Sequence, residues 1–183
     1  MTKPRYYFVF DVESVGLYGT GFAYGAVLID PEGTEIASWC EGTKPDGTMG
    51  DALSWKWVQD NIPLGSIPQS VGIESLRRLF WDTWKTAQGM AADRGANALM
   101  VADCPYPVET NFLASVVNQC ATDRFGESPY PLIDVGSVRL AAGMNPLGSC
   151  ERLPNELPIH NPLADARQSA RLLREALAWS QSR

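Results

Sequence analysis

The sequence is poor in histidine, in closely spaced cysteines and in basic charge, and each scarcity excludes a class of protein. It has one histidine and four cysteines, which lie far apart at Cys40, Cys104, Cys120 and Cys150. No C-x-x-C pair occurs and no histidine is near a cysteine, which excludes the ligand spacing of a structural zinc site. We therefore expect free thiols in a reducing compartment.

Long apolar runs are also missing. The first apolar run, 6–10, ends at Asp11 and is too short for a signal peptide or a membrane span. This predicts a soluble, cytoplasmic protein with no membrane partner. The net charge of −6 argues against a protein that coats long nucleic-acid duplexes, because that mode of binding needs an excess of lysine and arginine.

The remaining pattern is that of one compact α/β domain over residues 1–183, without repeats or linkers. We expect strands at 6–10, 21–29, 34–40, 99–102 and 131–134, and helices at 51–59, 73–92 (capped by Ser70), 110–120, 135–142 and 162–180. Three successive strands followed by strand–helix alternation predict a mixed sheet, an antiparallel meander plus parallel strands, flanked by helices.

Two carboxylates stand at the end of the first predicted strand, in Asp11-Val12-Glu13. Alternation of side chains along a strand places both on one face. Paired carboxylate oxygens are ligands that Mg²⁺ and Mn²⁺ prefer. Taken alone, however, the same pattern also fits the solvated entry to a loop.

The second motif lies near the other end of the chain, in His160-Asn161-Pro162-Leu163-Ala164-Asp165. Asn161 as N-cap and Pro162 at the first helical position predict a helix start, with Asp165 in the first turn. Histidine side chains can accept a proton near neutral pH, so His160 is a candidate general base beside a candidate ligand. Alone, the aspartate could simply complement the helix dipole.

Together, the two motifs resemble those of the DEDD 3′→5′ exonucleases, in their histidine-bearing subclass, which have a ribonuclease-H-like fold. The resemblance covers most of the chain. It implies a two-metal hydrolysis that uses Mg²⁺ or Mn²⁺ and releases nucleoside monophosphates from nucleic-acid 3′ ends. By motif position, Asp11 would bridge both ions, Glu13 and Asp165 would complete the ligands of the first, and His160 would deprotonate the attacking water. The bound ions would also let an acidic protein grip a short strand end.

Two neighbouring residues, Gly16 and Leu17, also match the family. By that resemblance, the Leu17 side chain would wedge against the terminal base while nearby backbone amides contact the last nucleotide. An ordinary turn with a buried leucine is the alternative.

The middle motif departs from the family, which usually has a Phe-Asp pair that is missing here. Two acids compete for its role. Asp103 directly follows a predicted strand and would be held rigidly, so we favour it as a catalytic residue and metal ligand. Glu109 stands three residues before Phe112-Leu113 and is the alternative; in that case Asp103 would support the site from outside the ligand set.

Other polar and aromatic residues have structural explanations. Asp134 is predicted to cap a helix. The arginines of the last helix, Arg167, Arg171 and Arg174, point about 150° away from Asp165 and predict a solvated face or a partner surface. The tryptophans at 55, 57, 81 and 84 are expected in the core or a subunit interface, although Trp55 or Trp57 could line a nucleic-acid groove.

Two other functions share part of this pattern. A haloacid-dehalogenase-like phosphohydrolase is disfavoured, because its second acid is Asp rather than Glu13 and it needs a late lysine, whereas no lysine follows Lys85. An inactive ribonuclease-H-like module that binds nucleic acid or protein is the alternative that the altered middle motif leaves open. The family resemblance and the tryptophans also make a homodimer an expectation.

Overall fold

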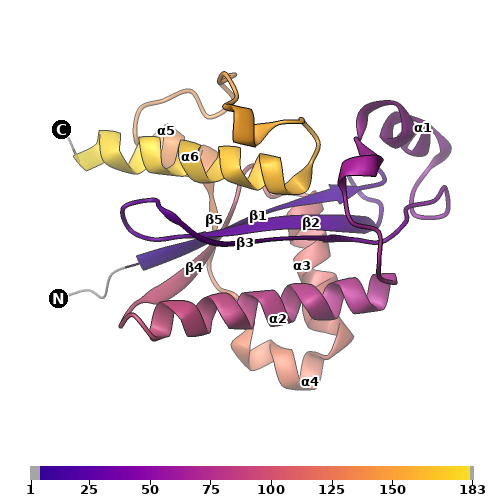
Figure 1. The fold of residues 1–183 in the computed structure, drawn as a ribbon, viewed down its shortest axis with the longest axis horizontal. Coiled ribbons are helices and arrows are strands. Elements are labelled where there is room, and N and C mark those ends of the chain that lie inside the picture. The colour runs from indigo at the N-terminus through magenta and orange to yellow at the C-terminus, as the bar shows by residue number, and fades with distance from the viewer. Residues whose placement is uncertain (1–4, 182–183) are drawn as a thin grey trace.

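The structure, a computed structural model, describes residues 5–181 and is built on a five-stranded mixed sheet (Figure 1). The strands are β1 (Arg5–Ser14), β2 (Gly21–Ile29), β3 (Glu35–Gly42), β4 (Asn97–Ala102) and β5 (Leu132–Asp134), in the order β3-β2-β1-β4-β5. The first three pair antiparallel, whereas β4 runs parallel to β1 and β5 parallel to β4. This confirms the predicted meander followed by parallel strands.

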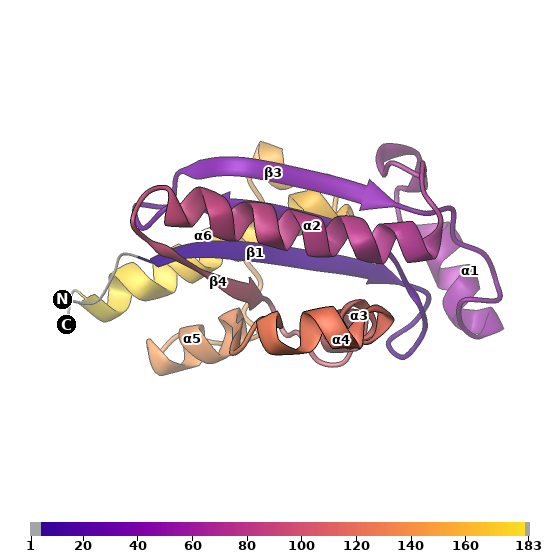
Figure 2. The same ribbon diagram turned by 90° about the horizontal axis from the view of Figure 1, so that it is seen from below.

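Helices cover both faces of this sheet. One face carries α2 (Ile73–Ala92), α3 (Val108–Gln119) and α4 (Ala121–Arg124), and the other carries α5 (Val135–Ala141) and α6 (Pro162–Gln181) (Figures 1 and 2). Helix α1 (Ala52–Asn61) lies beyond the end of β1. Short 3-10 turns occur at η1 (Leu64–Ser66), η2 (Phe125–Glu127) and η3 (Pro154–Glu156). None of the helices in residues 5–181 is long and apolar enough to cross a membrane.

The alternation of side chains along β1 divides the core into two layers. Phe8, Phe10 and Val12 pack with α2 and α3 on one side of the sheet. Val9 packs on the other side with Leu173 of α6. Because successive side chains of a strand point to opposite faces, the odd-numbered acids of β1 lie on the α6 side.

Most predicted element boundaries agree with the structure to within two residues, and the predicted cap Asp134 accepts hydrogen bonds from the amides of Gly136 and Ser137. The predicted cap Ser70 is wrong, because Gly72 precedes the first residue of α2 and no side chain caps it. Helix α3 begins at Val108, earlier than predicted. The carbonyls of Pro105 and Pro107 accept the amides of residues 110 and 111 and so start the helix sooner.

Candidate active site

Strand β1 places two acids on the α6 side of the sheet. Asp11 pairs with Gly25 of β2, and Glu13 pairs with Ala23. The strand continues to Ser14, so both acids lie inside it and their direction is set by the pleat. Glu13 is buried, with 7% of its surface exposed.

The start of α6 brings a third acid and the histidine. Asn161 caps the helix, since its Oδ1 accepts the amides of Leu163 at 3.1 Å and Ala164 at 3.2 Å. Its amide group also donates to Ser66, which ties the helix start to η1. His160 has a φ of 58°, a left-handed conformation that turns the chain into the helix at a cost of about 1–2 kcal/mol. Its backbone amide donates to Asp165 Oδ2 at 3.1 Å.

Gly25 lets this helix start approach β2 closely. An added Cβ at Gly25 would lie 2.1 Å from the Leu163 nitrogen and 2.2 Å from the Pro162 carbonyl carbon. No side chain fits there, and Gly25 is the strand partner of Asp11. The glycine therefore allows the first turn of α6 to lie close to the acids of β1. The sequence analysis did not predict this role of Gly25.

The structure thus brings together four of the five residues predicted to be catalytic. One ring nitrogen of His160 and one carboxylate oxygen from each of Glu13 and Asp165 lie within 4.8 Å of one another. Asp11 lies close enough to Glu13 and Asp165 for both charges to act on its pKa.

Glu109, in the first turn of α3, joins the same acids from the opposite side of β1. It is 6% exposed, and its Oε1 accepts the backbone amide of Val12 at 3.3 Å. Val12 stands between Asp11 and Glu13, so this bond holds the Glu109 carboxylate next to both. The early start of α3 is what places Glu109 there.

Asp103, which the sequence favoured over Glu109, gathers with Cys104 and Asp134, although its charge also reaches Glu109, whose pKa is raised by burial and then by Asp103. One ligand atom from each of Asp103, Cys104 and Asp134 lie within 4.8 Å of one another. Asp134 Oδ1 accepts the amide of Cys104 at 3.1 Å and also caps α5. The register explains this position: β4 ends beside β5, where Ala102 pairs with Asp134, whereas its last pairing with β1 is at Val101 and Val9.

The assembled acids hold more negative charge than their surroundings compensate. Burial, followed by the charges of Glu109, Glu13 and Asp165, raises the pKa of Asp11 well above its ordinary value. Burial, then Asp165 and Glu109, raises the pKa of Glu13 to about 8. Burial raises the pKa of Glu109 to about 7, against the hydrogen bond from Val12. Several raised pKa values within one group of acids are typical of a functional site.

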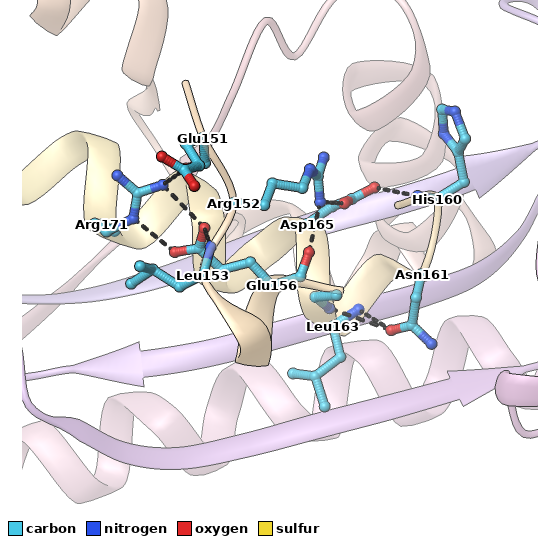
Figure 3. A network of polar contacts seen from close by, with 10 residues as sticks. Glu151, Arg152, Leu153, Glu156, His160, Asn161, Leu163, Asp165 and Arg171 are labelled. Carbon is cyan, nitrogen blue, oxygen red and sulfur yellow. Dashed lines mark hydrogen bonds and ion pairs between the residues drawn. The ribbon is translucent and has the colours of Figure 1, made fainter. Parts of the chain in front are cut away.

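A residue that the sequence did not predict, Arg152, reaches into this group (Figure 3). Its guanidinium Nη1 forms an ion pair with Asp165 Oδ1 and donates to the Glu156 carbonyl at 2.9 Å. Burial raises the pKa of Asp165, and the hydrogen bond and charge of Arg152 oppose that rise. Arg152 lies in an irregular segment with no motif around it, so no sequence signal indicated its role.

An apolar groove lies beside Glu13. The cleft has a volume of about 480 Å³, and its walls include Gly16, Leu17, Leu53 and Trp57. Leu17 is 63% exposed and Leu53 84% exposed, so apolar surface faces the solvent next to the acids. The Trp57 ring meets the His160 ring edge-on, with centroids 5.0 Å apart. Gly16 and Leu17, both predicted to bind substrate, therefore border the acid group.

The donor set fits hard divalent cations. Carboxylate oxygens and one imidazole converge within 4.8 Å, and these donors suit Mg²⁺ or Mn²⁺. The raised pKa values of Asp11 and Glu13 indicate that their ionised forms are unfavourable without a cation, which would stabilise them. All four cysteines are free thiols, as predicted, and none lies in this group.

Two other predictions have mixed outcomes. Trp84 is buried in the core as expected, whereas Trp57 is 44% exposed in the groove. The prediction of a solvated or partner-binding arginine face is wrong for two residues. Arg167 pairs with Glu35 at 2.9 Å and Arg171 with Glu156 at 2.7 Å, because both fold back onto neighbouring segments of the same chain.

Among known proteins, the chain matches solved structures but no sequence family. No protein-family model and no curated protein sequence matches the chain. The zinc-bound form of Escherichia coli exonuclease I with single-stranded DNA matches with a TM-score of 0.60 at 9% identity, over 95% of this chain and 40% of that one. A second exonuclease I structure matches at 0.58 with 10% identity (93% and 40%), and a complex of ExoI with SSB-Ct at 0.59 with 8% identity (100% and 43%).

These likenesses show the fold. The chain has an α/β, ribonuclease-H-like fold similar to that of exonuclease I, with a five-stranded mixed sheet flanked by helices. It spans 40–43% of the length of the exonuclease I chains that it matches.

Proposed function

We propose that this chain is a metal-dependent 3′→5′ exonuclease, which hydrolyses phosphodiester bonds at nucleic-acid 3′ ends and releases nucleoside monophosphates. The observation that carries the proposal is that Glu13 of β1, Asp165 of α6 and the ring of His160 converge within 4.8 Å beside an open apolar groove, while Glu109 of α3 is held against the backbone of β1 at Val12. The fold that the chain shares with exonuclease I supports it. Fold alone does not assign a reaction, so the argument rests on the site.

The proposed ligands are Asp11, Glu13 and Asp165, with Glu109 rather than Asp103 as the fourth acid. The hydrogen bond from Val12 and the effect of Glu109 on the pKa of Asp11 and Glu13 support this choice. Bound there, two divalent cations would activate the attacking water and stabilise the leaving oxygen. Asp103 is then a residue of the neighbouring β4–β5 edge.

His160 is the proposed general base. Its backbone is held by Asp165 and by the turn into α6, and its ring stands among the acids with Trp57 against it. The imidazole takes the proton from the attacking water, and the carboxylate of Asp165 stabilises the imidazolium that forms.

The groove is the proposed seat of the 3′-terminal nucleotide. Leu17, Leu53 and Trp57 offer apolar and aromatic surface to a nucleobase, and stacking of a base on an aromatic ring contributes about 1–3 kcal/mol without selecting sequence. This location puts the last phosphodiester next to Glu13.

A digestion assay tests the proposal. Matched single-stranded DNA and RNA oligonucleotides, labelled at the 5′ end, are incubated with the chain and Mg²⁺ or Mn²⁺. We expect products that shorten stepwise from the 3′ end, with release of nucleoside monophosphates, and no reaction in EDTA. His160→Ala should lower the rate on the order of 10²–10⁴-fold.

Matched variants distinguish activity of the proposed site from that of a contaminating nuclease. Asp11→Asn and Asp165→Asn should abolish turnover, whereas Asp93→Asn makes the same chemical change at the exposed C-cap of α2 and should leave it intact. Nucleic-acid binding without cation-dependent cleavage in the wild-type chain would favour the inactive binding module instead.

A further inference from the structure

Arg152 engages the proposed cation-binding carboxylate of α6. Its guanidinium pairs with Asp165 Oδ1, and the two side chains are 22% and 14% exposed. The second oxygen of Asp165 accepts the amide of His160. Both oxygens of this carboxylate therefore already hold protein donors, and one of those donors carries a full positive charge.

The segment around Arg152 is anchored on α6 from both sides (Figure 3). Glu156 is 1% exposed, and its two carboxylate oxygens accept Arg171 Nε at 2.7 Å and Arg171 Nη2 at 2.9 Å. Glu156 also accepts the amide of Leu153, while Arg171 donates to the Glu151 carbonyl. Residues 151, 153 and 156 are thus fixed to the helix that carries Asp165, so the backbone delivers Arg152 to that carboxylate.

The positive charge of Arg152 matters for cation binding at Asp165. Within residues 5–181, Arg152 is the only lysine or arginine that the structure pairs with Asp11, Glu13, Glu109 or Asp165. Burial raises the pKa of both Asp11 and Asp165 and the charge of Arg152 lowers it, so the guanidinium offsets part of the negative charge of the acid group. A divalent ion that used Asp165 Oδ1 would meet a guanidinium on the same oxygen, at a distance where like charges repel strongly.

We propose that Arg152 is a tethered counter-cation, which holds the cation-free acid group together and must leave Asp165 Oδ1 when a divalent cation binds. The proposal rests on the cation site of the proposed function. It makes Arg152 a positioning residue that sets the affinity for the metal, and it predicts opposite effects of its removal on the cation-free and cation-bound forms.

Isothermal titration of the full chain with MnCl₂ alone tests this directly. Arg152→Gln should bind Mn²⁺ about fivefold more tightly than the wild type, because the competing ion pair is gone. In EDTA the same variant should melt at a lower temperature than the wild type, and saturating Mn²⁺ should narrow that gap. Arg167→Gln is the matched control, since it removes the same charge from α6 at the Glu35 pair; its Mn²⁺ affinity should stay within about twofold of the wild type.

Equal or weaker Mn²⁺ binding by folded Arg152→Gln would overturn the counter-cation role while leaving the proposed function standing. No Mn²⁺ binding by the wild-type chain would overturn both. Arg152→Lys keeps the charge with a shorter reach and without the planar fork, so its affinity should lie between the two. Should the Gln variant fail to fold, the Lys variant decides: wild-type or weaker affinity refutes the role.

Discussion

Glu109→Gln is the substitution that most sharply separates the two candidates for the fourth acid. Glutamine keeps the size of the side chain and an oxygen that can accept the amide of Val12, so the first turn of α3 should persist. What disappears is one negative charge from a buried group. That charge is among the causes, after burial, that raise the pKa of both Asp11 and Glu13.

The size of the effect follows from the pKa of Glu109, which burial raises from 4.5 to about 7. Each pKa unit corresponds to about 1.4 kcal/mol, so ionised Glu109 costs the cation-free fold about 3 kcal/mol. The folded-state value lies above the unfolded one. The stability tied to this group is therefore complete below pH 4.5 and is lost as pH rises through about 7. Glutamine cannot ionise and escapes the loss.

Thermal unfolding in EDTA at pH 5 and pH 8 measures this. At pH 8, Glu109→Gln should melt about 5–10 °C above the wild type, and at pH 5 the difference should be much smaller. With Mg²⁺ present, its exonuclease rate should fall by about 100-fold or more, since even indirect supporters of metal ligands are worth roughly 10–100-fold.

Asp103→Asn is the paired control and should keep activity within about threefold of the wild type. The reasoning is refuted if Glu109→Gln gains no stability between pH 5 and pH 8 relative to the wild type. It is equally refuted if Asp103→Asn loses the activity that Glu109→Gln retains.

Two further substitutions test how the site is assembled. Gly25→Ala puts a methyl group 2.1 Å from the Leu163 nitrogen, so the start of α6 must shift. Mn²⁺ affinity and activity should fall sharply while the circular dichroism spectrum stays that of the wild type. Retained Mn²⁺ affinity would contradict the argument that Gly25 is needed for the close approach of α6. Trp57→Ala should lower kcat as well as raise KM, because the Trp57 ring contacts the proposed general base. Leu53→Ala, in the same groove, should raise KM alone. Equal kcat values in the two variants would contradict a role of Trp57 in positioning His160.

The sequence predicted the framework of the fold because its signals are local. The continuous apolar run before Asp11 forms a strand wherever the core lies, and Asn161-Pro162 starts a helix through contacts within its own first turn. The alternation of side chains then determined that Asp11 and Glu13 share a face. These features needed no knowledge of the tertiary packing.

The proposal of Glu109 in place of Asp103, by contrast, depends on tertiary packing. A short side chain at a strand end was a sound expectation of rigidity, but β4 ends beside β5, and Ala102 faces Asp134 there. Glu109 reaches Val12 across 97 residues of sequence. Spacing within one segment cannot indicate such a contact, because it depends on where α3 lies over β1.

The arginines show the same limit and give it a physical meaning. A helical projection correctly separates Arg171 from Asp165, yet it says nothing of the irregular segment that Arg171 binds through Glu156. The same segment carries a different arginine, Arg152, which pairs with Asp165 of α6. Two ion pairs therefore determine the charge balance of the site. The pair between Arg171 and Glu156 anchors the irregular segment to α6. The pair between Arg152 and Asp165 then offsets part of the charge of the carboxylates that the sheet and helices bring together. Acids held at raised pKa values with one tethered counter-charge form a group whose unfavourable energy a divalent cation can relieve.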